Sequence, residues 1–401
     1  MAQLRSKKIR IAAITSVATA ALVGGFTALP AQAAPATGTV LAAGSPTAIK
    51  DSYIITLEKT AGFKASSSEG KGLISEYGGT VKRTFGAALN GYSATLSAQE
   101  AARLAADPAV ATVEQNQTVH VDATQSSAPW GLDRIDQTSL PLSTTYTYPD
   151  TGGAGVTAYV IDTGVRITHT QIAGRATNGY DAVEGDNVAQ DGNGHGTHVA
   201  TTIAGSTYGV AKKANIVAVR VLDNAGSGTT AGVIAGINWV TSNHSGPSVA
   251  NMSLGGGAST TLDTAVSNSI ASGVTYAIAA GNSNANASSY SPARVATAIT
   301  VGATTSTDAR ASYSNYGSTL DIFAPGSSIL AGYNTSDTAT ATLSGTSMAT
   351  PHVAGAAAIY LASHTSATPA QVSTALVNGA TSNLVTSPGT GSPNKLLKIV
   401  P

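Results

Sequence analysis

Residues 345–355 read Gly345-Thr346-Ser347-Met348-Ala349-Thr350-Pro351-His352-Val353-Ala354-Gly355, where a polar loop gives way to an Ala-rich apolar run that predicts a buried helix. Ser347 therefore lies at the start of a helix. Unpaired backbone N–H groups and the positive end of the helix dipole favour the negative charge that forms when a serine attacks a carbonyl group. A serine at this position is more commonly an N-cap. Whether Ser347 is a cap or a nucleophile therefore depends on the other residues that the fold brings to it.

Around this stretch, apolar strand-like runs alternate with helical stretches. The strand-like runs are residues 156–161, 216–222, 249–254, 274–279 and 299–301. The helical stretches are residues 195–203, 230–241, 262–271 and 348–362, and Thr368-Pro369-Ala370-Gln371 begins a further helix with capping residues and an early proline. This alternation predicts an α/β fold with a doubly wound parallel sheet, in which ligands bind at the carboxyl ends of the strands.

Two further motifs stand where such a sheet places a site. Tyr159-Val160-Ile161-Asp162-Thr163-Gly164 ends a buried strand with Asp162. Asp191-Gly192-Asn193-Gly194-His195-Gly196-Thr197-His198-Val199-Ala200 brings His195 to the point where a Gly-rich loop enters a helix. A buried carboxylate needs a partner, and an imidazole N–H is a suitable one. A neutral imidazole held in this way takes the proton of a serine hydroxyl as it attacks.

Each of these residues also has a simpler interpretation. Asp162 alone is a cap or a turn residue, and His195 alone is an ordinary loop histidine. His195 and His198 together are a candidate metal pair. That interpretation is the weaker one, because their spacing is three and no acid of the H-E-x-x-H type lies beside them.

The motifs resemble those of a known family. Asp162-Thr163-Gly164, His195-Gly196-Thr197-His198 and Gly345-Thr346-Ser347-Met348-Ala349, in that order, look like the subtilisin-like serine proteases. Further strings are similar to the proteinase K-like branch, close to aqualysin, and the similarity spans residues 123–401. These strings are Ala128-Pro129-Trp130-Gly131-Leu132-Asp133-Arg134-Ile135, Asn251-Met252-Ser253-Leu254-Gly255-Gly256, Ala280-Gly281-Asn282 and Phe323-Ala324-Pro325-Gly326.

The resemblance implies a role for each position. It implies that Asp162 orients the imidazole, that His195 is the general base and acid, and that Ser347 attacks the peptide carbonyl. Asn282 matches the family's oxyanion-hole asparagine, whose side-chain N–H acts together with the backbone N–H of Ser347. The expected activity is that of a serine endopeptidase that forms an acyl-enzyme. The family cuts with broad specificity and a preference for aliphatic or aromatic side chains before the cut.

Two Gly-rich segments resemble the edges of the family's substrate cleft. They are Gly226-Ser227-Gly228 and Ser253-Leu254-Gly255. Exposed backbone at a strand edge allows a peptide to add as a β-strand through main-chain hydrogen bonds. The alternative interpretation is that both segments are ordinary turns.

The first 33 residues predict a secretory signal peptide. Arg5, Lys7, Lys8 and Arg10 form a basic head, residues 11–29 are apolar, and Ala31-Gln32-Ala33 provides a small-x-small cleavage site. An N-terminal membrane anchor is the alternative, but Gly24-Gly25 and Pro30 interrupt the apolar run and weaken a stable span. We therefore expect a secreted, extracellular protein without stable membrane association.

A small unit follows the signal segment. Residues 34–48 predict a linker, and residues 51–121 predict the order β-α-β-β-α-β of an α+β ferredoxin-like fold. This unit resembles the inhibitory propeptide of these proteases, an intramolecular chaperone whose C-terminal tail lies in the cleft until it is cut. The resemblance places the cut between Asp122 and Ala123. Residues 34–122 would then be linker and propeptide, and residues 123–401 the peptidase domain.

The composition excludes some classes of function. Lys and Arg together number 21, as do Asp and Glu, so the chain lacks the basic excess of a nucleic-acid-binding protein. The 401 residues include no cysteine, which rules out disulfides and thiolate metal sites. An exported chain without disulfides must be stabilised by packing or by bound ions.

The resemblance implies that calcium is a structural cofactor. Asp321 matches the family's side-chain ligand, with the carbonyl groups of Ala296 and Ala298 as partners, and such hard oxygen ligands suit Ca²⁺. A second candidate cluster near the expected mature N-terminus consists of Asp133, Asp136 and Gln137. For that cluster, surface acids surrounded by water are an equally good interpretation.

The chain departs from its relatives in its lack of cysteine. Aqualysin-like proteases have half-cystines at the positions of Gly192, Asn224, Ser288 and Thr319. We therefore expect insensitivity to thiol reagents and a greater reliance on calcium.

The expected partners are protein and peptide substrates and the chain's own propeptide, and the family favours a monomer. A different class of function is a catalytically silent relative that binds peptides or serves only as an inhibitor. Such a protein would need a lost catalytic residue or a blocked cleft. All four catalytic positions are intact in this sequence.

Overall fold

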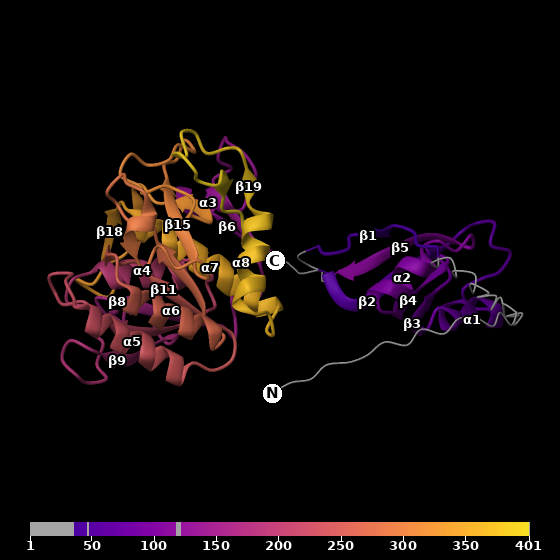
Figure 1. Ribbon diagram of the computed structural model, residues 1–401, viewed down its shortest axis with the longest axis horizontal. Coiled ribbons are helices and arrows are strands. Elements are labelled where there is room, and N and C mark those ends of the chain that lie inside the picture. The colour runs from indigo at the N-terminus through magenta and orange to yellow at the C-terminus, as the bar shows by residue number, and fades with distance from the viewer. Residues whose placement is uncertain (1–35, 46–47, 118–121, 401) are drawn as a thin grey trace, which may run out of the picture. The chain divides into compact units, whose positions relative to one another are not determined.

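A computed structural model describes residues 36–45, 48–117 and 122–400 of the chain (Figure 1). The expected signal peptide lies outside these residues. The chain divides into two compact units, of which the smaller contains Asp51–Glu114 and the strand at Val40–Leu41, and the larger contains Gln115–Pro401.

The small unit has the predicted order of elements. Its sheet has the strand order β1-β5-β2-β4-β3, which is the ferredoxin-like order with β1 added at one edge. Val40 and Leu41, expected within a linker, instead form β1 and pair in parallel with β5. The remaining elements are β2 (Ala48–Leu57), α1 (Ser68–Glu76), β3 (Thr80–Phe85), β4 (Gly91–Thr95), α2 (Ala98–Leu104) and β5 (Val110–Gln117).

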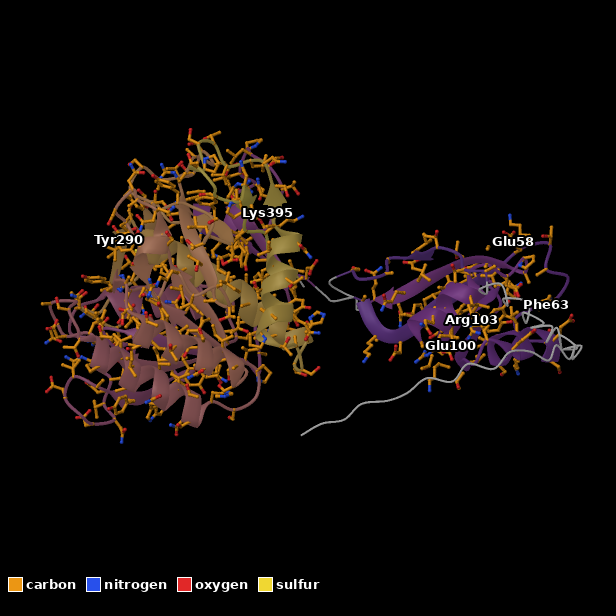
Figure 2. The ribbon with its side chains drawn as sticks, viewed as in Figure 1. Glu58, Phe63, Glu100, Arg103, Tyr290 and Lys395 are labelled. Atoms are coloured by element: carbon orange, nitrogen blue, oxygen red, sulfur yellow. The ribbon has the colours of Figure 1, made fainter. Side chains whose placement is uncertain are left out.

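Local capping determines where the two helices of the small unit begin. Ser67 accepts a hydrogen bond from the backbone N–H of Gly70 at the start of α1. Ser97 and Glu100 form the predicted reciprocal capping box at the start of α2, where Glu100 is labelled in Figure 2. The helices pack on the sheet around a buried core that includes Ile55, Tyr92 and Leu104.

The described part of the large unit is built on a nine-stranded sheet with the order β19-β20-β16-β15-β13-β11-β8-β10-β9. Its neighbouring strands are parallel except for β19 and β20 at one edge. The predicted parallel sheet is confirmed. Its strands are β8 (Thr157–Asp162), β9 (Ala176–Asp181), β10 (Asn215–Arg220), β11 (Ser248–Met252), β13 (Thr275–Ala279), β15 (Ile299–Thr304), β16 (Ile322–Pro325), β19 (Thr381–Ser382) and β20 (Lys395–Leu396).

Helices cover both faces of this sheet, as a doubly wound fold requires. Ala158 and Val160 of β8 lie in one buried cluster, with α4, α7 and α8, whereas Tyr159 and Ile161 lie in another, with α5 and α6. Successive residues of a strand point to opposite faces, which explains the alternation. The helices are α3 (Trp130–Ile135), α4 (His195–Ala204), α5 (Thr230–Asn243), α6 (Thr260–Ala271), α7 (Thr346–Ser363) and α8 (Pro369–Gly379).

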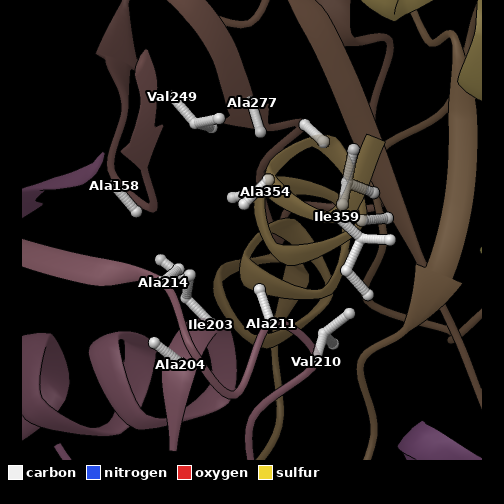
Figure 3. Packing of buried hydrophobic residues seen from close by; sticks show 14 of the residues in the cluster. Ala158, Ile203, Ala204, Val210, Ala211, Ala214, Val249, Ala277, Ala354 and Ile359 are labelled. Atoms are coloured by element: carbon white, nitrogen blue, oxygen red, sulfur yellow. The ribbon is translucent and has the colours of Figure 1, made fainter. Parts of the chain in front are cut away.

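Helix α7 is the buried centre of the larger cluster. Figure 3 shows Ala354 and Ile359 of α7 among Ala158, Val249 and Ala277 of the sheet. Most of its residues from Thr346 to Leu361 are buried. The Ala-rich sequence permits this close packing because small side chains let the helix approach the strands.

Three short two-stranded sheets complete the large unit. The first of them contains the expected processing site, and both of its strands belong to the large unit. The pairs are β6 (Asp122–Ser126) with β7 (Thr145–Pro149), β12 (Gly256–Gly257) with β14 (Tyr290–Ser291), and β17 (Ile329–Gly332) with β18 (Thr340–Leu343).

Candidate active site

Three adjacent strands bring two of the predicted catalytic residues and one predicted substrate-binding residue to the same end of the sheet. Asp162 is the last residue of β8, Ser253 follows β11, and Asn282 follows β13. Since β8, β11 and β13 are neighbours and parallel, their carboxyl ends lie side by side. The site therefore lies where the alternating pattern of strands and helices places it.

Asp162 and His195 form a direct pair. Asp162 Oδ1 lies 2.7 Å from His195 Nδ1 and also accepts the backbone N–H of Thr163 at 2.7 Å. The carboxylate is fully buried, while the imidazole is 26% exposed. The Asp162 carboxylate holds the proton on Nδ1, which leaves Nε2 as a base.

Two opposing effects act on the protonation of His195. Burial lowers its pKa, but the charge of Asp162, the hydrogen bond to it and the charge of Asp191 raise the pKa by more. The net pKa is therefore raised above its ordinary value. The imidazolium form gains stabilisation from two carboxylates, which is what a base needs when it receives a proton during a reaction.

Ser347 lies in the first turn of α7, but it is not the cap. The N-cap is Gly345, and the helix has no side-chain cap. The Ser347 hydroxyl donates to the carbonyl oxygen of Ser253 at 3.2 Å, and the Ser253 hydroxyl donates to the carbonyl oxygen of Ser347 at 2.8 Å. These reciprocal bonds join the start of α7 to the end of β11. The simple capping interpretation is therefore wrong.

Thr346, the residue before Ser347, fixes the orientation of the Asn282 side-chain amide. Its Oδ1 accepts the backbone N–H of Thr346 at 2.8 Å and the Thr346 hydroxyl at 3.0 Å. This orientation turns the Nδ2 donor away from Thr346. A Cβ atom placed on Gly345 would lie 3.5 Å from Asn282 Nδ2 and 3.6 Å from the backbone N of Ser347. Both donors therefore lie on the same side of Gly345.

A cleft of about 570 Å³ adjoins His195. All six predicted substrate-binding residues, Gly226, Ser227, Gly228, Ser253, Leu254 and Gly255, line it. Apolar side chains that the sequence analysis did not select also line it, namely Leu222, Val233 and Leu262. Leu222 follows β10, Val233 lies in α5 and Leu262 lies in α6. The sequence predicted these elements, but only the completed fold brings the three side chains to one cleft.

Asp321 directly precedes β16 and is bonded to the neighbouring strand β15. Its Oδ2 accepts the backbone N–H of Thr300 at 2.8 Å, and its own N–H donates to the Thr300 carbonyl oxygen at 2.9 Å. Burial raises the pKa of Asp321 to about 6, against the lowering effect of the Thr300 bond. Ala298 directly precedes β15 and Ala296 lies two residues earlier, so both come from the segment beside Asp321.

The second candidate cluster is bonded within its own loop. Asp133 is 2% exposed, and its oxygens accept the N–H and hydroxyl of Ser143 and the N–H of Thr144, at 2.7–3.0 Å. Gln137 Oε1 accepts the same Ser143 N–H at 3.1 Å. Asp136 Oδ2 accepts the N–H of Thr147, whereas its buried Oδ1 has no hydrogen-bond partner in the described chain. Asp133 is therefore not a water-surrounded surface acid.

His198 does not join His195 at a metal site. Its Nε2 donates to the carbonyl oxygens of Ile329 and Ala341, at 3.0 and 3.2 Å, on the hairpin β17–β18. His352 of α7 similarly uses Nδ1 to donate to Met348 O at 2.8 Å. The described residues hold no group of three or more His, Cys, Asp or Glu side chains arranged for a metal.

Burial determines the charge state of these two histidines. It lowers the pKa of His198 and of His352 to about 4, although the carbonyl bonds act in the opposite direction. Both side chains are at most 1% exposed. Protonating His198 would also add an N–H donor at Nδ1, a buried atom without a partner in the described chain.

We expect His198 and His352 to make the fold less stable as the pH falls from 6.5 to 4. In this range the unfolded chain binds protons at His198 and His352, whereas the folded chain keeps both neutral. Their contribution to the free energy of unfolding therefore falls as the pH falls, by up to about 3 kcal/mol for each histidine. Calorimetry should give a Tm that depends less on pH in His198→Gln than in the wild type. An equal slope in both proteins would contradict this account.

Two family models match the chain. The Subtilase family matches residues 153–395, and the peptidase inhibitor I9 family matches residues 52–122. An extracellular serine proteinase of Thermus sp. (strain Rt41A) is 57% identical over 320 residues, 80% of this chain and 78% of the relative. Alkaline serine exoprotease A of Vibrio alginolyticus is 50% identical over 382 residues, 91% of this chain and 71% of the relative.

A solved structure has a similar fold. The crystal structure of a cold adapted subtilisin-like serine proteinase matches with a TM-score of 0.67 and 57% sequence identity, and the match covers 69% of this chain and 100% of the other chain.

Within the residues described, no helix has both the length and the apolar character needed to cross a membrane.

Proposed function

The chain belongs to the subtilase family of serine endopeptidases and carries an I9 propeptide domain, and we propose that it cuts peptide bonds through Asp162, His195 and Ser347. The observation that carries the proposal is the 2.7 Å contact between Asp162 Oδ1 and His195 Nδ1 beside the cleft. A helix cap and a loop histidine would not need this pair.

The proposed reaction begins when His195 Nε2 takes the hydroxyl proton of Ser347 as its oxygen attacks the peptide carbonyl carbon. The imidazolium that forms is stabilised by the Asp162 carboxylate. The imidazolium then gives the proton to the amine nitrogen as the peptide C–N bond breaks, and the acyl group stays on the Ser347 oxygen. Water, deprotonated by His195, releases this group and restores the hydroxyl.

The Ser347 hydroxyl must turn before it reacts. Its present acceptor is the carbonyl oxygen of Ser253, so rotation about the Cα–Cβ bond has to transfer the hydroxyl to His195. Catalytic hydrogen bonds commonly tighten only when substrate is bound. Ser253 also forms an edge of the cleft, so we propose that a bound peptide competes for its carbonyl and promotes this rotation.

We propose that Asn282 Nδ2 and the Ser347 N–H stabilise the oxyanion of the tetrahedral intermediate. The positions of both donors beside Gly345 support this role. Oriented donors act most strongly on charge that develops only in the transition state. Thr346 keeps the amide of Asn282 in the necessary orientation.

The cleft favours an extended peptide with apolar side chains. Residues 226–228 and 253–255 offer backbone on its two sides, and Leu222, Val233 and Leu262 offer apolar surface. Among the cleft-lining residues none is Asp, Glu, Lys or Arg. This supports broad specificity with a preference for aliphatic or aromatic side chains.

A digest of a denatured protein tests this specificity. We expect cuts at many sequences, mainly after aliphatic and aromatic residues, as identified by mass spectrometry of the peptides. Cuts restricted to positions after Lys and Arg, or after Asp and Glu, would contradict the proposed cleft.

We propose that the enzyme is made as a signal–propeptide–protease precursor that cuts itself between Asp122 and Ala123. Asp122 is exposed, and the I9 match ends at this residue. In the structure Ala123 pairs with Tyr148 between β6 and β7. This pairing must open before the bond enters the cleft, and it secures the new N-terminus afterwards. N-terminal sequencing should find Ala123 or a residue close to it, whereas a start within Asp51–Glu114 would contradict the assignment.

We propose one structural calcium site, formed by Asp321 Oδ1 with the carbonyl oxygens of Ala296 and Ala298. The residues fit the ion, because Oδ2 alone accepts a hydrogen bond among the described residues and Oδ1 is left for a cation. Ca²⁺ would supply the positive charge that this carboxylate lacks. The second cluster offers fewer free oxygens, because Asp133 and Gln137 already use theirs as hydrogen-bond acceptors and Asp136 Oδ1 alone has no donor in the described chain.

Chelation tests the calcium site. We expect removal of calcium to lower the Tm of the mature protein by about 5–10 °C, since a ligand at a hundredfold excess over its Kd adds about 2.7 kcal/mol. Asp321→Asn should lose this response, and the exposed Asp150→Asn should keep it. An unchanged Tm in the wild type under chelation would contradict the proposal.

We also propose secretion and a monomeric state. The named relatives that are extracellular support secretion. The mass of the protein recovered from the culture medium, measured by light scattering, tests both points. A cell-bound or dimeric product would contradict them.

A further inference from the structure

A second buried carboxylate lies behind His195. Asp191, in the loop between β9 and α4, is 3% exposed and has no part in the reaction proposed above. Its Oδ1 accepts the N–H groups of Asn193 and Gly194 and the hydroxyl of Thr163, at 2.8–2.9 Å. Its Oδ2 accepts the N–H and the hydroxyl of Thr197, at 2.9 and 2.6 Å.

The bond to Thr163 goes beyond what a helix start requires. An ordinary cap at α4 would need only the backbone N–H groups around Gly194. The Thr163 hydroxyl instead comes from the end of β8, directly after Asp162, and it also accepts the N–H of Gly196 at 2.9 Å. Asp191 and Thr163 therefore join the strand that carries Asp162 to the helix that carries His195.

A neighbouring hairpin supports the same loop. Asn334 Nδ2 donates to the carbonyl oxygen of Asp191 at 3.1 Å, and the Tyr333 hydroxyl donates to that of Asn193 at 3.0 Å. A Cβ atom on Gly194 would lie 2.3 Å from the Tyr333 ring. The loop before α4 is thus bonded to the end of β8 on one side and to Tyr333 and Asn334 on the other.

Three ionisable groups face the imidazole of His195. They are Asp162 from β8, Asp191 from the loop and His198 further along α4. Burial lowers the pKa of His195, and the charges of Asp162 and Asp191 raise it. Asp191 therefore acts on His195 without contacting it.

We propose that Asp191 is a positioning residue for peptide hydrolysis, whose carboxylate locks the loop before α4 onto the end of β8 and stabilises the His195 imidazolium. This inference rests on the proposed function of Asp162, His195 and Ser347. The side chain contacts neither substrate nor the reacting atoms. It holds the imidazole on Asp162 and supplies a second negative charge as the base receives its proton.

Asp191→Asn in the mature enzyme tests both parts of the proposal. We expect kcat to fall about ten- to a hundredfold, as when outer partners of metal-binding histidines are removed, with KM changed by less than about threefold. The neutral imidazole is the active base, so activity falls where His195 becomes protonated. Removing the Asp191 charge lowers the pKa of His195, and the acid limb of kcat/KM should move to lower pH.

Variants of Thr163 distinguish the positioning effect of Asp191 from the effect of its charge. Thr163→Val removes the link between β8 and Asp191 but keeps the charge, so kcat should fall without movement of the acid limb. Thr163→Ser keeps the hydroxyl and should restore kcat. This pair keeps the proposal testable if Asp191→Asn does not fold.

Asp308→Asn is the matched control. Asp308 is also buried, at 7% exposure, and it bonds to the buried Arg134 at 2.7 Å, away from the catalytic groups. This variant should lower the Tm but leave kcat and the acid limb unchanged. The proposal is overturned if Asp191→Asn keeps the wild-type kcat and acid limb, or if Asp308→Asn reproduces its effects. Failure of the triad itself is recognised separately, by activity that survives in Ser347→Ala.

Discussion

Ser347→Ala is expected to lower kcat by about a millionfold, a figure that comes from subtilisin, a member of the same family, and to leave the precursor uncut. The reason is that the proposed mechanism uses the Ser347 hydroxyl, in the first turn of α7, as the nucleophile that His195 deprotonates. The residual rate would come from Asn282 and from binding of the substrate. Hydrolysis of casein and the mass of the precursor measure the two effects.

Ser363→Ala is the matched control for this variant. Ser363 is the last residue of the same helix, and its buried hydroxyl has no hydrogen-bond partner in the described chain. Its replacement should leave both processing and turnover unchanged. Hydrolysis that persists in purified Ser347→Ala, after wild-type contamination has been excluded, would contradict the mechanism.

Asn282 should give the second largest effect. Removing its side-chain donor is expected to lower kcat by about 10²–10³-fold, a magnitude that again was measured in subtilisin. KM should change by less than about threefold, because the donor acts on an oxyanion that exists only after the attack. Steady-state kinetics on a short peptide separate the two constants.

Two substitutions distinguish the catalytic part of Asn282 from its structural part. Asn282→Leu removes both the donor and the acceptor for Thr346, whereas Asn282→Asp keeps the acceptor. Both should lose turnover, and Asn282→Asp should keep the wild-type Tm more closely. Asn378→Ala, at an exposed position of α8, serves as the control. An effect on KM alone would argue against the oxyanion role.

Much of the fold follows from local sequence. The parallel strands β8, β10, β11, β13 and β15 and helices α4 to α8 lie within a few residues of their predicted positions, because each has a buried apolar pattern. The edge strand β9 was not predicted. Its sequence, ATNGYD, is polar and only half buried, so it lacks the pattern of a central strand.

Contacts between distant segments could not be predicted in the same way. The pairing of β6 with β7 and of β17 with β18 joins short polar runs whose partners are set by the completed fold. The sequence analysis selected Asp162, His195, Ser347 and Asn282 from their motifs. It did not select Asp191, although the same motif contains it, because the bond to Thr163 spans 28 positions.

Covalent labelling of Ser347 tests the central claim most directly. A fluorophosphonate reacts with a serine that has been activated by a neighbouring base, and the product is read from the mass of the intact mature protein and of its peptides. We predict one adduct for each mature chain, located on Ser347, and no adduct in Ser347→Ala or when His195 is replaced by Ala. An unlabelled but proteolytically active protein, or an adduct on a different serine, would contradict the claim that Asp162 and His195 activate Ser347.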